Sequence, residues 1–120
     1  MKTPYEIIKN MENATGTERY HMYSAMPGYP VATDGAYCLA KDAECFWLLD
    51  LIGRYQSNKK LDRDFQVWEL EVNQEHETGV LRGYNDTEQV IEHELEYTDF
   101  PLDKVTLWLM DGVILLPSEY

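Results

Sequence analysis

The spacing of apolar residues changes part-way along the chain. In residues 41–56, KDAECFWLLDLIGRYQ, apolar side chains recur at helical spacing, whereas apolar and acidic residues alternate in FQVWELEV (65–72) and QVIEHELEY (89–97). A period near 3.6 is typical of an amphipathic helix, and a period of two is typical of a half-buried strand. The first half is therefore predicted to be mainly helical and the second half to form a sheet.

Two helices are expected in the first half. Thr3, Pro4 and Glu6 form a capping-box pattern, so one helix should begin there and stop near Gly16. The main helix should cover residues 41–56. Its expected cap is Asp42, its expected pair on the surface is Asp50 with Arg54, and its expected buried side chains are Cys45, Phe46, Trp47, Leu48, Leu49, Ile52 and Tyr55.

The segment between these helices, residues 17–40, contains two prolines and two glycines and is predicted to be mostly loop. Its stretch RYHMYSAMPGYP carries Tyr20, Tyr23 and Tyr29 together with methionines. Such side chains are favoured in the centres of protein interfaces. The segment is therefore either a lid over apolar strands or an aromatic contact loop.

The chain ends in two apolar runs, VTLWLM and VILLP, joined by Asp111 and Gly112. An Asp-Gly pair between strands favours a tight type I′ hairpin. Because both runs are apolar at nearly every position, both of their faces should be covered. One face is expected to pack on the helix around Trp47. The other could be covered by the N-terminal helix, the aromatic loop or a second copy of the chain.

These elements predict a single α+β domain over residues 1–120, with N-terminal helices packed on a four- to five-stranded, mostly antiparallel sheet that ends in a β-hairpin. A content of 44% hydrophobic residues is sufficient for a core. We find no apolar run long enough for a membrane span and no signal-peptide pattern at the start. Cys38 and Cys45 are too few for a disulfide scaffold. We expect a cytoplasmic protein.

Charge is distributed unevenly between the two halves. The formal net charge is −12; residues 1–60 hold seven acidic and seven basic residues, and residues 61–120 hold fifteen acidic and three basic ones. Nucleic acids and anionic membranes need cationic contacts, so this composition argues against direct binding to either. A basic protein partner remains compatible with it, as does a simple solubilising role.

The order of several segments resembles a known family. TDGAYCLA, FWLLDLI, FQVWELEV, YTDFPLDKVTLWL and the terminal GVILLPSEY are similar to segments of a family of small bacterial proteins that is catalogued as a domain of unknown function and is often plasmid- or phage-borne. The resemblance implies a bacterial setting and a mobile-element origin. It implies no activity, ligand or catalytic residue.

A row of glutamates is the most unusual feature of the predicted sheet. Glu92, Glu94 and Glu96 alternate with apolar residues and should stand about 7 Å apart on one strand face, and Glu69 and Glu71 are expected to continue the row on a neighbouring strand. This face could contact a basic partner or mimic the phosphate row of DNA. Alternatively, it is a solvated face whose like charges prevent edge-to-edge aggregation.

Two similar turns offer another candidate site. Asp34 lies in TDG and Asp99 in TDFP, and two carboxylates that converge could serve as an acid/base pair. The structural alternative is that each Asp bonds its own turn backbone. For a site, both residues must lie in one concave pocket together with a His or Tyr.

The chain carries no motif typical of nucleophilic catalysis, phosphate binding or zinc binding. His93 falls on the apolar side of its strand, where a hydrogen-bonded core histidine is expected. We predict no catalytic, metal or cofactor-binding residue and no cofactor. The expected function is a non-enzymatic interaction or accessory protein. The alternatives are an acidic inhibitor that mimics DNA and a small-molecule-binding or hydrolytic domain around Asp34 and Asp99.

Overall fold

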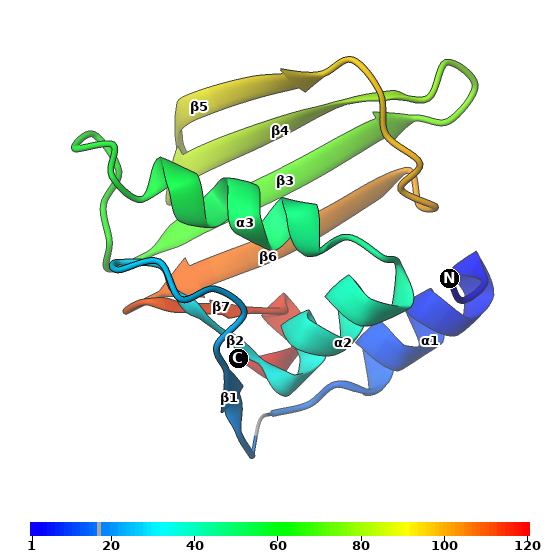
Figure 1. Cartoon of the computed structure of the whole chain (residues 1–120), viewed down its shortest axis with the longest axis horizontal. Helices are drawn as coiled ribbons and strands as arrows, with labels where there is room; N and C mark the ends of the chain where they lie inside the picture. The colour runs from blue at the N-terminus through cyan, green and yellow to red at the C-terminus, as the bar shows by residue number, and fades with distance from the viewer. Residues whose placement is uncertain (17) are drawn as a thin grey trace.

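The computed structural model describes residues 1–16 and 18–120. These residues form three α-helices, a seven-stranded sheet and a short 3₁₀ helix (Figure 1). In chain order the elements are α1 (Pro4–Asn13), β1 (Tyr20–His21), β2 (Val31–Thr33), α2 (Asp34–Asp42), α3 (Phe46–Tyr55), β3 (Gln66–Asn73), β4 (Thr78–Asn85), β5 (Glu88–Leu95), β6 (Lys104–Met110), β7 (Val113–Leu115) and η1 (Pro117–Glu119).

The sheet has the order β1-β2-β7-β6-β3-β4-β5, and every pair is antiparallel except β2 with β7. The α+β class is confirmed. The prediction of four to five strands was wrong in number, because the sheet has seven, and the parallel pair makes the sheet mixed. The two extra strands, β1 and β2, come from the segment that was predicted to be mostly loop.

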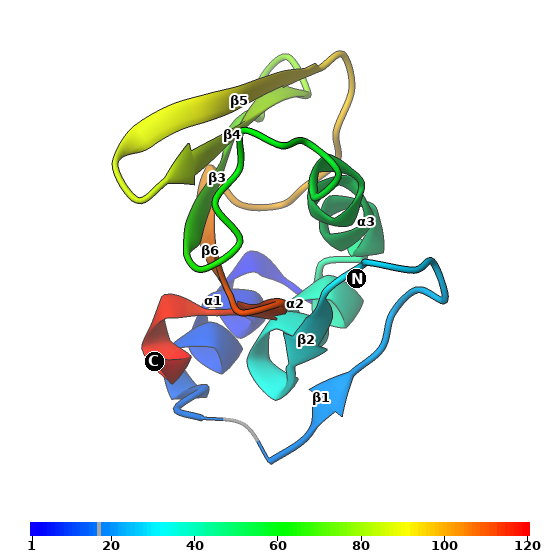
Figure 2. The same ribbon diagram turned by 90° about the vertical axis from the view of Figure 1, so that its left-hand side faces the viewer.

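The helices α2 and α3 lie on the inner side of the sheet, and the core forms between these helices and the strands. Its largest fully buried side chains are Trp68, Phe100, Ile7, Leu48, Leu49, Ile52, Leu70, Leu81, Leu107, Leu109, Ile114 and Leu116. Figure 2 shows α3 on one side of β3, β4 and β5, and no described helix on the other side of these strands. That outer side is called the open face below.

A helix that was not predicted, α2, begins in segment 17–40 and ends at Asp42. The side chain of Thr33 accepts a hydrogen bond from the backbone N–H of Ala36 at 3.2 Å and caps α2. The buried side of α2 consists mostly of small residues, Gly35, Ala36 and Ala40, which produce no strong apolar pattern in the sequence. Asp42 ends this helix, so the prediction that Asp42 caps the main helix was wrong.

The main helix is shorter than predicted and begins after Cys45, its N-cap. Leu48, Leu49 and Ile52 are buried as expected, but Phe46 is partly exposed. The predicted pair is present, with Arg54 Nε 2.9 Å from Asp50 Oδ2. The capping box of α1 is also present: Thr3 Oγ1 accepts from the Glu6 N–H at 3.2 Å.

The predicted terminal hairpin is confirmed. Asp111 and Gly112 both have positive φ, at 50° and 79°, as a type I′ turn requires. On the inner side Leu107 and Leu109 are buried. On the outer side, Trp108 makes edge contacts with Phe65 and Tyr120. The chain's own C-terminal residues thus provide part of the cover for this face.

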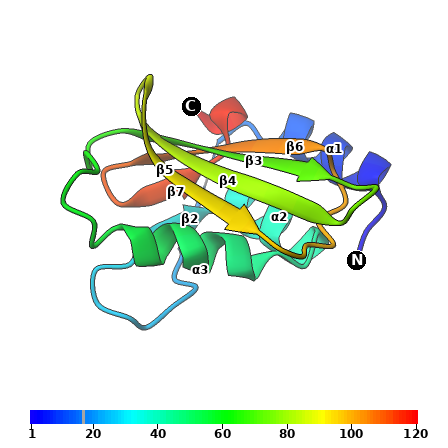
Figure 3. The same ribbon diagram turned by 90° about the horizontal axis from the view of Figure 1, so that it is seen from above.

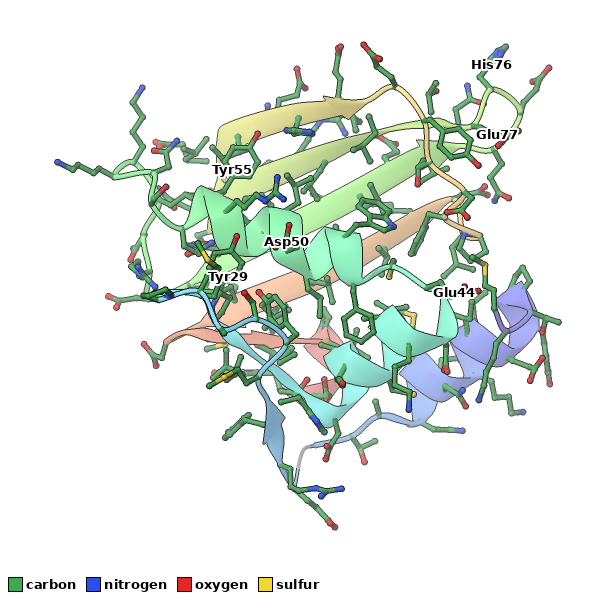
Figure 4. The ribbon with its side chains drawn as sticks, in the orientation of Figure 1. Tyr29, Glu44, Asp50, Tyr55, His76 and Glu77 are labelled. Carbon is green, nitrogen blue, oxygen red and sulfur yellow. The ribbon has the colours of Figure 1, made fainter. Side chains whose placement is uncertain are left out.

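The aromatic loop packs beside α3 and does not lie over the hairpin. A Cβ at Gly53 would stand 2.6 Å from a ring carbon of Tyr29, and the Tyr23 hydroxyl donates a hydrogen bond to the Leu49 carbonyl at 2.9 Å. Figure 4 shows Tyr29 next to this helix. Tyr20, in contrast, is exposed. The loop is therefore a lid on α3, with its end, β2, paired to β7.

Candidate functional site

The strand register brings the predicted glutamates together on the open face. Glu69 pairs with Arg82, and Arg82 pairs in turn with Glu92. In the next row, Glu71 lies between Lys104 of β6 and Val80 of β4, and Val80 pairs with Glu94. The residues of one row share a face because directly opposite residues point to the same side of a sheet.

Two cations interrupt this acidic face. Arg82 Nη1 lies 2.7 Å from Glu71 Oε1 and its Nε lies 3.3 Å from Glu92 Oε1, while Lys104 Nζ lies 3.1 Å from Glu69 Oε2. The hydrogen bond from Arg82 lowers the pKa of Glu71. Three of the five predicted glutamates are therefore already paired within the sheet.

The paired Glu71 and further carboxylates, unpaired within the described residues, line a groove at the end of the open face, beside the β3–β4 turn and the end of β5. Its volume is about 860 Å³. We call it the acidic groove, and its acidic lining residues are Glu71, Glu75, Glu94, Glu96 and Asp103. Its apolar lining residues are Val72, Val80 and Leu95, of which only Val80 shares the row of Glu71 and Glu94 on the open face, and no Lys or Arg is among the lining residues in the described part of the chain.

Glu94 and Glu96 have no ion-pair partner among residues 1–16 and 18–120. Asp103 accepts a hydrogen bond from Gln74 Nε2 at 2.6 Å, which holds the far wall of the groove. Figure 4 shows His76 at the adjoining β3–β4 turn, pointing out from the end of the sheet. The groove therefore presents the unpaired carboxylates of Glu94 and Glu96 beside the apolar side chain of Val80, an arrangement suited to a cationic side chain with an aliphatic stem.

Sequence reasoning identified three of the five acidic lining residues and missed Glu75 and Asp103. Both lie in connections, Glu75 after β3 and Asp103 just before β6. The antiparallel pairing of β3 with β4 and β6 brings those connections to the same end of the sheet. The available signal was that pairing: once β3 and β6 are placed side by side, their adjoining loops must meet.

Asp34 and Asp99 are placed in different hollows. Asp34 begins α2, where its carboxylate accepts the Glu18 N–H at 2.9 Å and lies 2.7 Å from His21 Nε2. Asp99 lines a hollow of about 180 Å³ with Trp47 and Tyr97. Asp34 lines a separate hollow of about 440 Å³, which does not include Asp99.

His21 and Glu119 both contact residues at the start of α2. The ring of His21 stacks on Tyr37 with centroids 4.3 Å apart. Glu119 accepts hydrogen bonds from Thr33 Oγ1 at 2.6 Å and from the Gly35 N–H at 3.0 Å. Because Glu119 also accepts from the Leu116 N–H at 2.9 Å, it joins the C-terminal turn to this helix. These contacts give both His21 and Glu119 a structural role.

Neither cysteine is activated as a nucleophile. Burial and a hydrogen bond to the Asp42 carboxylate raise the pKa of Cys38, and burial raises the pKa of Cys45 to about 12. His93 Nδ1 lies 2.6 Å from the Tyr55 hydroxyl, the hydrogen-bonded setting that the sequence predicted. Over the described residues, no three His, Cys, Asp or Glu side chains are grouped so that they could hold a metal ion.

Comparison with known proteins gives a family and no activity. The model of a family of unknown function, DUF6876, matches residues 5–120. The chain belongs to this family. No curated protein and no solved structure gives a significant match. None of the helices described here has the length and apolar character to cross a membrane.

Proposed function

We propose that this member of the DUF6876 family is a non-enzymatic interaction protein whose acidic groove binds a basic segment of a protein partner. The observation that carries the proposal is the described lining of the groove, with five carboxylates, of which only Glu71 is held by a cation, and no Lys or Arg among the lining residues. Electrostatic complementarity of this kind accelerates association and selects partners by charge. The setting we propose is a bacterial cytoplasm, on the resemblance to small plasmid- and phage-borne proteins.

The cations of the open face favour a discrete basic segment over a DNA-binding cleft as the partner surface. A DNA mimic needs a long, unbroken row of negative charge to match the phosphates. Here Arg82 and Lys104 divide the row, and the unpaired glutamates are confined to its end. A short cationic segment fits this confined charge better than a surface that holds a duplex.

Two double variants of equal net charge test the proposal. In Glu94→Lys/Glu96→Lys the groove is reversed, and in Glu18→Lys/Asp64→Lys two exposed acids outside its lining are reversed instead. Each is used as bait in a nuclease-treated bacterial lysate at low and high salt. We expect a protein that is retained by the wild type and by the outside variant, released at high salt, and lost in the groove variant.

Equal retention by both variants would contradict the proposal, because net charge alone would then explain binding. The absence of any salt-sensitive protein would also contradict it. Circular dichroism of both variants checks that they are folded before the comparison is made.

A further inference from the structure

The strand β5 has an outer edge that no described strand pairs with. It is the last strand of the sheet, and its only described partner is β4. Seen from above in Figure 3, no other described strand lies alongside its outer edge. An unpaired edge of eight residues presents backbone donors and acceptors to any extended segment that approaches it.

The hydrogen-bond pattern identifies which residues of β5 face outward along this edge. The N–H of Val72 donates to the Asp103 carbonyl, on the β6 side of β3, at 2.8 Å. Backbone groups alternate in direction along a strand, so Glu71 and Glu69 direct theirs toward β4. The same alternation, carried through the register of β4, leaves the N–H and C=O of Glu92 and Glu94 pointing away from the sheet.

The two sides of this edge differ in chemistry. On the open face, Glu94 lines the acidic groove. On the helix side, Leu95 lines the hollow of about 180 Å³ together with Trp47 and Tyr97. Side chains of an added strand would alternate between these two environments, one strongly acidic and the other largely apolar.

We propose that the partner's basic segment binds as an eighth, antiparallel strand along β5, with Lys or Arg alternating with apolar residues. The basic residues would lie opposite Glu94, which has no ion-pair partner among the described residues, and opposite Glu92, which would share its carboxylate between the added cation and Arg82; oppositely charged cross-strand pairs are favourable. The apolar residues would face Trp47 and Leu95. In this binding mode main-chain hydrogen bonds supply affinity, and alternate side chains supply specificity.

A second copy of this chain does not fit the same edge. Antiparallel pairing of β5 with β5 would bring the glutamates of one copy against those of the other, and like charges directly opposite are destabilising. The charge of the edge therefore selects a basic strand and rejects self-association. This inference rests on the proposed function, since it specifies how a basic segment is held at the same surface.

The test uses fluorescence anisotropy with fluorescein-labelled peptides of about nine residues, within the usual range of strand lengths and long enough to span β5. The first peptide alternates Lys and Val. The second has the same composition with all lysines in one half. Two further peptides carry backbone N-methyl groups, at the Lys positions or at the Val positions. Only the Lys positions, opposite Glu92 and Glu94, would direct their N–H groups at β5.

We expect the alternating peptide to bind at least about tenfold more tightly than the block peptide, and N-methylation at Lys to weaken binding about tenfold more than N-methylation at Val. On the protein side, Glu94→Ala removes the charge and keeps the edge N–H, whereas Glu94→Pro removes both. Proline is tolerated at edge positions whose N–H faces solvent. Glu94→Pro should therefore bind several-fold more weakly than Glu94→Ala.

The outcomes separate the two proposals. If alternating and block peptides bind equally, and both methylated peptides behave alike, strand addition is overturned while the acidic groove keeps its function. If no peptide binds with salt sensitivity, the proposed function itself fails. Should Glu94→Pro prove unfolded, the pair of methylated peptides decides the question on the wild-type protein.

Discussion

Asp42 joins the two N-terminal helices. Its carboxylate accepts hydrogen bonds from Asn10 Nδ2 at 3.0 Å and Cys38 Sγ at 3.3 Å, and Lys2 Nζ lies 3.6 Å away. Burial by itself raises the pKa of this carboxyl, but the hydrogen bonds and the Lys2 charge outweigh burial and hold the pKa below its ordinary value. The ionised form of Asp42 therefore stabilises the packing of α1 on α2.

We expect Asp42→Asn to lower the free energy of unfolding at pH 7 by about 1–2 kcal/mol, since hydrogen bonds to a buried charged group are lost. A carboxyl whose folded-state pKa is lowered contributes stability above its unfolded pKa, near 4, and loses that contribution as the pH falls through the folded pKa. The two proteins should therefore begin to converge in stability as the pH falls below about 4 and become equal only below the lower folded-state pKa. Urea unfolding across pH measures this.

Glu12→Gln, at an exposed position of α1, serves as the control and should leave the neutral-pH stability nearly unchanged. A deficit of Asp42→Asn that stays constant from neutral to acid pH would show that ionisation of Asp42 is not what holds the helices together.

At the scale of elements, the long patterned strands were predictable and the short ones were not. The strands β3 and β5 alternate over eight residues each, so their faces could be assigned from sequence. The strand β2 has three residues, and its parallel pairing with β7 joins distant parts of the chain without any local signal. Its neighbour α2 starts at TDG. This tripeptide is typical of a turn as well as of a helix start, because the Thr hydroxyl can bond the following backbone in both.

The residues of the candidate site likewise divide into those that a local pattern predicts and those that tertiary packing places. The acidic face follows from a period of two within single strands, which is a local property. The ion pairs of Arg82 and Lys104 depend on register between strands, and Glu75 and Asp103 reach the acidic groove from connecting loops. Register and loop placement are set by tertiary packing, so the composition of the groove could not be obtained from the spacing of residues alone.

Gly83 allows β4 to pass over the ring of Trp68. A Cβ at this position would stand 2.7 Å from two ring carbons, and the ring is 1% exposed with its Nε1 donating to Gln66 Oε1 at 2.9 Å. The hydrogen bond and the burial of the ring oppose its movement away from β4. We expect Gly83→Ala to destabilise the fold by about 1–3 kcal/mol through overpacking, as measured by urea unfolding.

A double-mutant cycle with Trp68→Phe isolates this contact. The smaller ring leaves room for the added methyl group, so the effect of Gly83→Ala should be markedly smaller when Trp68→Phe is also present. Additive effects in the cycle would mean that the cost of alanine at Gly83 arises from the backbone and not from the ring.

At the scale of the whole molecule, the acidic groove concentrates the charge imbalance of the chain. The net charge of −12 comes entirely from residues 61–120, and Glu94 and Glu96 line one groove without an ion-pair partner among the residues described. Like charges at close range oppose the compact state. The groove should therefore lower the stability of the fold while it provides a binding surface.

Replacing Glu94 and Glu96 with Gln tests this conflict. We expect the double variant to melt about 2 °C higher than the wild type at low ionic strength, because repulsion is relieved without loss of an ion pair. The gain should shrink in 1 M salt, where the Debye length is about 3 Å and exposed charges are screened. Glu71→Gln is the matched control: it removes an acid from the same lining but also breaks the pair with Arg82, so it should bring no such gain.

Peptide binding, measured on the same variants, distinguishes a solubilising role of Glu94 and Glu96 from a binding role. If Glu94 and Glu96 serve only solubility, their replacement should raise the melting temperature and leave the affinity for an alternating Lys–Val peptide unchanged. If they form the binding surface, stability and affinity should move in opposite directions, with Glu94→Gln/Glu96→Gln more stable and weaker in binding. A variant that is both less stable and weaker in binding would instead make these glutamates structural, and would contradict the charge argument for the groove.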